Sequence, residues 1–181
     1  MIKKWSILSE SELTRTPIFS LHQMEASSPL NPEKRGMFVY LDVPSWINII
    51  AITPEKEVIF VRQYRHGNRS VTLEIPGGMC EEGESFIEAG ARELIEETGY
   101  RGDRVELIGV VDPNPAFQNN RCGTILVHNA VKVKEQELDP MEEIEIALIP
   151  LAEIDDLIRS GQVSHSLVVA AFFHLKLHST L

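Results

Sequence analysis

Apolar residues are grouped into short runs separated by polar segments that contain glycine or proline. Such runs are typical of β-strands, and those beyond residue 43 lie at 46–52, 57–65, 71–75, 104–111, 121–134 and 144–149. A longer amphipathic segment at 86–98 predicts a helix, and two more helices are expected at 151–160 and 164–177. Strands on both sides of a central helix, with helices at the end, predict an α/β sandwich that holds a mixed sheet between helices.

The central helix has clear signals at both ends. Ser85 and Glu88 form an S-x-x-E capping box, and Gly99 suits the left-handed residue that follows many helices. Successive residues turn by about 100°. Four apolar residues therefore share one face, which is expected to pack on the core: Ile87, Ala91, Leu94 and Ile95.

Another face of this helix is acidic, because Glu93, Glu96 and Glu97 are spaced at i, i+3 and i+4. Like charges at this spacing repel by about 0.2–0.5 kcal/mol per pair. One interpretation is a solvated acidic surface. The other is a cluster of hard oxygen ligands for Mg²⁺, or alternatively Mn²⁺. The paired glycines Gly77 and Gly78 favour the second interpretation, because they place an irregular backbone beside the carboxylates.

Residues 1–42 predict a small β-rich appendage to a main domain at 43–181. Its candidate strands are the runs at 5–8, 18–22 and 37–41, and the polar stretch at 25–36, with two prolines, predicts a turn region. Strands this few do not form a stable fold alone. They are expected to extend the main domain or to pair with a second subunit.

Composition narrows the classes of function. The chain has 181 residues and a formal net charge of -10, which disfavours a nucleic-acid partner and leaves phosphate substrates dependent on cations. Cys80 and Cys122 form no disulfide or C-x-x-C pattern and are expected to be reduced thiols in a cytoplasmic protein. The first ten residues lack the apolar segment of a signal peptide, and the run at 167–173 is too short to span a membrane.

The stretch from Gly78 to Tyr100 resembles the Nudix box, G-x5-E-x7-R-E-U-x-E-E-x-G-U, where U is a bulky apolar residue. Every fixed position is matched, and the one departure is an aromatic Tyr100 where an aliphatic residue is usual. The resemblance implies the Nudix α/β/α fold and hydrolysis of a diphosphate that links a nucleoside to another group. It also implies roles for individual residues: Glu93 and Glu97 as Mg²⁺ ligands, Glu96 and the Gly77 carbonyl as further ligands, and Arg92 and Glu84 as an orienting ion pair.

The segment Arg62-Gln63-Tyr64-Arg65, followed by Leu73 to Gly78, resembles the ADP-ribose pyrophosphatase and nucleoside-diphosphate-sugar branch of that family. The resemblance implies that Arg62 and Arg65 contact phosphate, although solvated arginines on an edge strand are the alternative. It implies that Trp5 stacks on the base in a homodimer, the alternative being a core or interface tryptophan. It also assigns Glu142 or Glu143 as a metal ligand or general base, the alternative being a solvated acidic loop.

The loop at 111–121 carries Pro115, sixteen residues beyond Gly99, a position associated with ADP-ribose hydrolases. Its amides, among them Asn119, can hydrogen-bond sugar hydroxyls. The loop departs from the S-P-G and acidic pattern of those enzymes, which favours broader specificity. An ordinary turn is the alternative.

ADP-ribose, giving AMP and ribose 5-phosphate, is the leading expected substrate, with GDP-mannose and other nucleoside diphosphate sugars behind it. The rival functions are hydrolysis of NADH, diadenosine polyphosphates or oxidised nucleoside triphosphates, and a non-catalytic ligand sensor.

Overall fold

The computed structural model of the protein describes residues 1–178, which form two compact units. The N-terminal unit comprises Met1–Pro44 together with Asp112–Arg121, and the larger unit comprises Ser45–Val111 and the described residues from Cys122 onward. The loop at 112–121 therefore groups with the N-terminal strands, which its position in the sequence did not suggest.

The N-terminal unit is an antiparallel sheet in the order β1-β2-β3, formed by β1 (Ser6–Arg15), β2 (Ser20–Ser28) and β3 (Asn31–Asp42). The turn expected within 25–36 is only two residues long, at 29–30, and the rest of that stretch belongs to two long strands. Pro32 is accommodated because β3 is an edge strand and its pairing with β2 is irregular between Ser27 and Ser28.

The loop at 112–121 is tied to the end of β3 by several hydrogen bonds. The Leu41 N–H donates to the Phe117 carbonyl at 2.8 Å. The Asn119 side chain accepts from the Val43 N–H at 3.1 Å and donates to the Asp42 carboxylate at 2.6 Å. The amide of Asn119 thus holds the loop against the strand.

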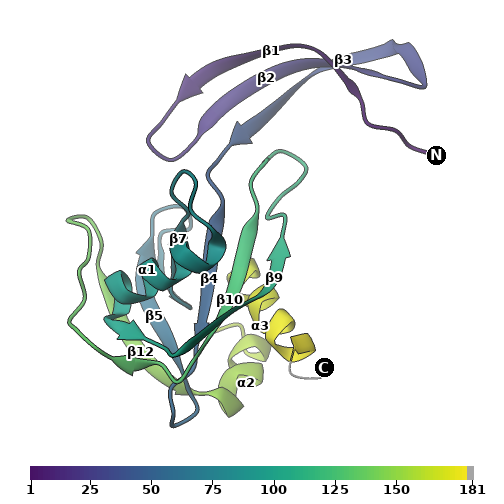
Figure 1. The fold of residues 1–181 in the computed structure, drawn as a ribbon. Coiled ribbons are helices and arrows are strands. Elements are labelled where there is room, and N and C mark those ends of the chain that lie inside the picture. Colours follow the sequence, from purple (N-terminus) through teal and green to yellow (C-terminus); the bar gives the residue numbers. More distant parts are fainter. Residues whose placement is uncertain (179–181) are drawn as a thin grey trace. The chain divides into compact units, whose positions relative to one another are not determined.

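The larger unit holds a mixed sheet between helices, as expected, together with an antiparallel sheet and a short two-stranded pair (Figure 1). The mixed sheet has the order β7-β4-β10-β9, with β4 and β10 parallel and the other pairs antiparallel. The antiparallel sheet has the order β12-β5-β6, and β8 pairs with β11. The strands are β4 (Trp46–Ala51), β5 (Glu57–Arg65), β6 (Ser70–Glu74), β7 (Gly77–Met79), β8 (Tyr100–Arg101), β9 (Arg104–Val111), β10 (Cys122–His128), β11 (Val131–Lys132) and β12 (Ile144–Pro150).

Helices cover both faces of these sheets. Helix α1 (Phe86–Thr98) packs on one side, and α2 (Ile154–Arg159) with α3 (Ser166–His178) packs on the other (Figure 1). A short 3₁₀ turn, η1 (Leu151–Glu153), precedes α2, so the helix expected at 151–160 has two parts. Within residues 1–178, no helix is both long and apolar enough to cross a membrane.

Each layer has its own hydrophobic core, which explains why β4 and β5 bury apolar side chains on both of their faces. Successive side chains of a strand point to opposite faces. Ile47 and Ile49 therefore pack toward α1, whereas Ile50 packs toward α3. On the α3 side, the rings of Phe60 and Phe172 stack with their centroids 5.7 Å apart.

The strand expected at 121–134 is interrupted. Strand β10 ends at His128, and Asn129 adopts a positive φ of 50°. The Ala130 N–H then donates to the Ile52 carbonyl at 2.9 Å before the short strand β11 begins. A single non-glycine residue in the left-handed region, of the type that tolerates it best, turns the chain here.

The face of α1 that packs on the core agrees only in part with the expected one. Leu94 is buried as expected, but Ile87 is 43% exposed, and Ala89, Gly90 and Glu97 are buried instead. Gly90 explains the rotation: a Cβ there would lie 2.2 Å from Ile125 Cδ1, so the helix approaches the sheet most closely along this side. Because positions 90, 93 and 97 share that side, the carboxylates of the helix turn inward.

Candidate active site

The carboxylates of α1 face the glycine strand β7. The Gly77 N–H donates to Glu97 Oε2 at 2.9 Å. A Cβ at Gly78 would lie 2.2 Å from Glu93 Oε1, and a Cβ at Gly77 would lie 2.2 Å from the Ile47 carbonyl oxygen. Gly77 is therefore needed for the backbone to pass close to β4, and Gly78 leaves room for the Glu93 carboxylate.

Arg92 connects the loop and the helix through its whole guanidinium group. Nε and Nη2 each donate at 3.0 Å to a different oxygen of Glu84, which is the ion pair expected from the sequence. Nη2 also donates to the Met79 carbonyl at 3.0 Å, and Nη1 donates to Glu93 at 2.9 Å and to Glu96 at 3.1 Å. These bonds hold the pKa of Glu84 below its ordinary value and fix the orientation of the helix carboxylates.

The two inward carboxylates carry more negative charge than their surroundings neutralise. Burial raises the pKa of Glu97 to about 8; the Gly77 N–H opposes this shift, and the charges of Glu93 and Glu142 add to it. Burial also raises the pKa of Glu93, against the effect of Arg92. A cation bound between these groups would relieve both penalties.

The donor set fits a small divalent ion that keeps part of its shell for other ligands. Among residues 1–178, no group of three or more histidine, cysteine, aspartate or glutamate side chains is arranged to hold a metal ion by itself. Mg²⁺ is usually held by only one or two carboxylates, with waters and substrate phosphates completing its octahedron. Glu93 and Glu97, one helical turn apart, supply such a pair.

The other acidic candidates occupy different positions. Glu96 is 42% exposed and is held by Arg92. Glu142 lies exposed in a turn, with its N–H on the Asp139 carbonyl at 2.9 Å, and its charge acts on both Glu93 and Glu97. Glu143 lines a different cavity, described below, and no interaction links it to the helix carboxylates in the described chain.

The two arginines of β5 have different surroundings. Arg62 donates to Glu145 at 2.8 Å across the β5–β12 pair and, with Glu142 and Glu143, lines a cavity of about 560 Å³. Arg65 interacts with one carboxylate of the pair through its charge. Glu74 raises the pKa of Arg65 most, and the negative charges of Glu97 and Glu142 raise it further.

Trp5 and Asn119 belong to the N-terminal unit. Trp5 is partly buried and meets Phe38 edge-on, with ring centroids 5.6 Å apart. The Asn119 amide is engaged with Asp42 and Val43, as described above. Within that unit, therefore, both side chains have local packing or hydrogen-bonding roles.

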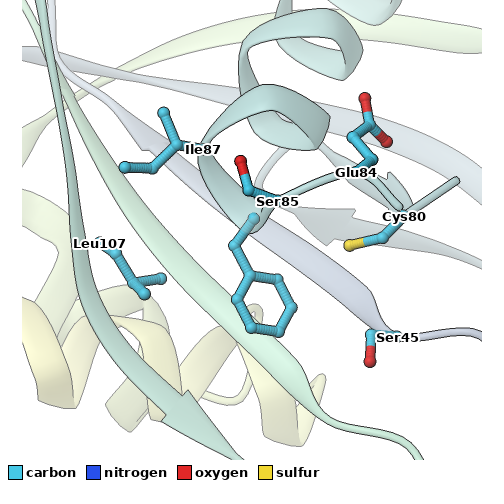
Figure 2. Close-up of a pocket in the computed structure, with 7 residues that line it drawn as sticks. Ser45, Cys80, Glu84, Ser85, Ile87 and Leu107 are labelled. Carbon is cyan, nitrogen blue, oxygen red and sulfur yellow. The ribbon is translucent and has the colours of Figure 1, made fainter. Parts of the chain in front are cut away.

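A separate cavity of about 340 Å³ lies beside the N-terminal end of α1 (Figure 2). Ile87 and Leu107 form an apolar part of its wall, and Cys80 points into it, whereas the carboxylate of Glu84 turns away. Burial raises the pKa of the Cys80 thiol, which keeps it protonated and weakly reactive. This cavity contains neither Glu93 nor Glu97 and is not the site of the acidic chemistry.

The sequence interpretation missed a buried carboxylate, Glu74, which is 3% exposed. It accepts hydrogen bonds from Arg65 at 3.0 and 2.8 Å, from Thr72 at 2.6 Å and from His165 at 2.9 Å. An acidic residue between Leu73 and Ile75, next to Pro-Gly-Gly, was the available signal. Nothing in the sequence indicated His165 as its partner.

Replacing Glu74 with glutamine is expected to make the stability of the folded protein depend less on pH at acidic pH. Burial alone would raise the pKa of Glu74, but hydrogen bonds from His165, Arg65 and Thr72 outweigh it and hold the pKa far below its ordinary value of 4.5. The ionised group therefore stabilises the fold above about pH 4.5, and this stability is lost as the pH falls further. Thermal unfolding from about pH 6 down to 3 measures the effect. Glu145→Gln, at an exposed carboxylate, is the control, and parallel curves for Glu74→Gln and the unaltered protein would contradict the assignment.

A family model described as the NUDIX domain matches residues 44–172. The chain is 30% identical over 139 residues to the ADP-ribose pyrophosphatase of Bacillus subtilis (strain 168), covering 76% of this chain and 75% of that protein. It is 25% identical over 175 residues to the ADP compounds hydrolase NudE of Escherichia coli (strain K12), covering 95% and 91%. A crystal structure of an ADP compounds hydrolase has the same fold, with a TM-score of 0.85 and 22% identity over 97% of this chain and 94% of that one.

Proposed function

The chain belongs to the Nudix family, and on this basis we propose that it hydrolyses the diphosphate bond of nucleoside diphosphate sugars, with ADP-ribose as the leading substrate. The observation that carries the proposal is the pair Glu93 and Glu97, turned inward against Gly77 and Gly78 and oriented by Arg92. The names of the relatives support an ADP-containing substrate. The products would be AMP and ribose 5-phosphate, and GDP-mannose and other nucleoside diphosphate sugars are further candidates.

Nudix hydrolases need a divalent metal, and we propose Mg²⁺, with Mn²⁺ as a substitute. Glu93 and Glu97 would hold it, with Glu96, Glu142 and the Gly77 carbonyl as further candidate ligands. The bound ion would neutralise the diphosphate and lower the pKa of a water molecule that attacks phosphorus.

The residues of the chain supply orientation and proton transfer. Arg92 and Glu84 keep the helix carboxylates in place through their paired hydrogen bonds. Arg65 is proposed to contact a phosphate oxygen through Nη1, because its Nε and Nη2 donate to Glu74. Glu142, or alternatively Glu143, accepts the proton from the attacking water, since Glu142 is exposed and its charge reaches the carboxylate pair. Arg62 is a second candidate for phosphate contact.

Two parts of the proposal rest on the resemblance and on the N-terminal unit. Trp5 is proposed to stack on the base, and Asn119 to contact a sugar. A homodimer is proposed because β1 is exposed along its length and the N-terminal sheet leaves Ile7, Leu13 and Met37 more than half exposed (55%, 51% and 56%). Sedimentation analysis tests this stoichiometry, and a monomer at micromolar concentration would exclude the dimer.

A dinucleotide such as NADH is the second candidate substrate, because the Escherichia coli relative is named for ADP compounds in general. A non-catalytic sensor is disfavoured, because the carboxylates and their ion pairs are all present. These alternatives differ in which molecules are turned over.

We expect the purified protein to release AMP and ribose 5-phosphate from ADP-ribose only when Mg²⁺ or Mn²⁺ is added. A panel with GDP-mannose, UDP-glucose, NADH and diadenosine polyphosphates, scored by released phosphomonoester, measures the preference. Chelation of the metal with EDTA should remove the activity. If the protein hydrolysed none of these compounds at any metal concentration, hydrolysis would be excluded and the sensor function would be favoured.

A further inference from the structure

A cavity of about 360 Å³ lies beside Arg65, outside the carboxylate pair. This volume is near the lower end of ligand pockets, about 300–1,000 Å³. The residues that line it all have polar side chains: Arg65, Asn68, Thr72, Glu74, Ser164, His165 and Ser166. They come from the end of β5, the following turn, strand β6 and the segment that begins α3.

Glu74 makes one wall of this cavity rigid, because each of its two carboxylate oxygens accepts two hydrogen bonds. Oε1 accepts from Arg65 Nε and Thr72 Oγ1, and Oε2 accepts from Arg65 Nη2 and His165 Nδ1. The segment carrying His165 is held independently, since Asn48 Nδ2 donates to the Leu167 carbonyl at 3.0 Å. Polar groups held in this way lose little conformational freedom when a ligand binds.

The bond to Glu74 also determines what His165 can offer a ligand. An ionised carboxylate only accepts hydrogen bonds, so His165 Nδ1 must carry the proton that it donates. In the neutral imidazole, Nε2 then has its lone pair available as an acceptor. Among the described residues, Nε2 of His165 makes no hydrogen bond.

The charge of the cavity wall indicates the class of ligand. Arg65 and Glu74 neutralise each other, and the other lining side chains are uncharged when His165 is neutral. A phosphate would meet no excess positive charge here, and an apolar group would leave serine and asparagine groups unpaired. A neutral group rich in hydroxyls satisfies these donors and acceptors best.

We propose that this cavity binds the sugar of the nucleoside diphosphate sugar and that His165 determines specificity by accepting a hydrogen bond from a sugar hydroxyl. Arg65 connects the two regions, since it lines the cavity and also lies in the electrostatic field of Glu97 and Glu142. A diphosphate beside the carboxylate pair would have its sugar next to Arg65. The inference rests on the proposed function and adds to it the residue that reads the sugar.

The test uses His165→Asn, because asparagine keeps a donor near the position of Nδ1 and removes Nε2. The matched control is His128→Asn, at another histidine bonded to a carboxylate, Glu106, at 2.8 Å, which does not line this cavity. Kinetics compare ADP-ribose with the methyl ester of ADP, which has the same nucleoside and diphosphate but lacks the terminal sugar. We expect kcat/KM for ADP-ribose to fall by about three- to tenfold in His165→Asn, the range of one hydrogen bond, with the methyl ester and the control unchanged.

An equal loss for both substrates would show that His165 acts only by supporting Arg65, and it would overturn the proposal, as would no loss. Binding of ribose 5-phosphate and methyl phosphate, measured by calorimetry, separates this inference from the proposed function. If the unaltered protein hydrolysed neither substrate, the proposed function would fail, and selective loss of ribose 5-phosphate binding in His165→Asn would still support the sugar site. Should His165→Asn fold poorly, Ser164→Ala removes another lining hydroxyl without touching Glu74, and the same selective loss is expected.

Discussion

Replacing Glu97 with glutamine is expected to abolish hydrolysis and to stabilise the metal-free protein at the same time. Glutamine keeps the size of the side chain and removes the charge that would bind the cation. Loss of a metal worth several kcal/mol in the transition state corresponds to at least about a thousandfold in kcat/KM. Steady-state kinetics with ADP-ribose and titration of Mn²⁺ measure the two losses.

The gain in stability follows from the direction of the pKa shift. Burial raises the pKa of Glu97 from 4.5 to about 8, so the folded state retains a proton that the unfolded chain has released. The stability of the metal-free protein therefore falls as the pH rises from about 4.5 toward 8, and the glutamine variant avoids this loss. At pH 8 its melting temperature is expected to be several degrees higher. Added Mg²⁺ should raise the melting temperature of the unaltered protein and not that of the variant.

Glu96→Gln is the matched control, because Glu96 lies one residue away on the same helix but is 42% exposed and bonded to Arg92. Its metal-free stability is expected to stay close to that of the unaltered protein. Full activity in Glu97→Gln would remove Glu97 from the site. A lower melting temperature in metal-free Glu97→Gln at pH 8 would show that its buried charge is compensated by the protein.

The parts of the site that were predictable are those formed within one short stretch of chain. The capping box at Ser85 is present with both of its hydrogen bonds, and Gly99 has the expected left-handed φ of 74°. Arg92 and Glu84 are eight residues apart, so the geometry of one loop and one helix is enough to pair them. Regular helix periodicity also placed Glu93 and Glu97 on one side.

The parts that were not predictable depend on contacts between distant segments. His165 reaches Glu74 across 91 residues, and no local pattern relates the two. The side of α1 that packs on the core is chosen by Gly90, whose missing side chain leaves room for Ile125, rather than by Ile87. The polar sequence at 25–36 becomes part of a long hairpin because cross-strand pairing outweighs the weak β-propensity of its residues.

Gly78→Ala is expected to cost activity with little change in stability. No positive φ is required at Gly78, so the backbone can accept alanine. The new Cβ would lie 2.2 Å from Glu93 Oε1 and 2.3 Å from its Cδ, which forces the carboxylate away from its position beside Arg92. A displacement of about 1 Å in a catalytic group lowers the rate by about 100-fold. Kinetics and thermal unfolding measure the two properties, and Gly67→Ala is the control, since a Cβ there meets nothing within 4 Å.

The proposed cause, displacement of Glu93, can be separated from a general effect on the loop by a double-mutant cycle. If alanine at position 78 acts by moving the Glu93 carboxylate, then Gly78→Ala adds little to the loss already caused by Glu93→Gln, because the displaced group is no longer a ligand. If alanine instead distorts the backbone around Gly77, the two losses multiply, because the Gly77 N–H that holds Glu97 is disturbed independently. We expect the first result, since the three atoms nearest to the added Cβ all belong to Glu93. If the two losses of activity multiply, the effect of Gly78→Ala arises from distortion of the strand backbone and not from displacement of Glu93.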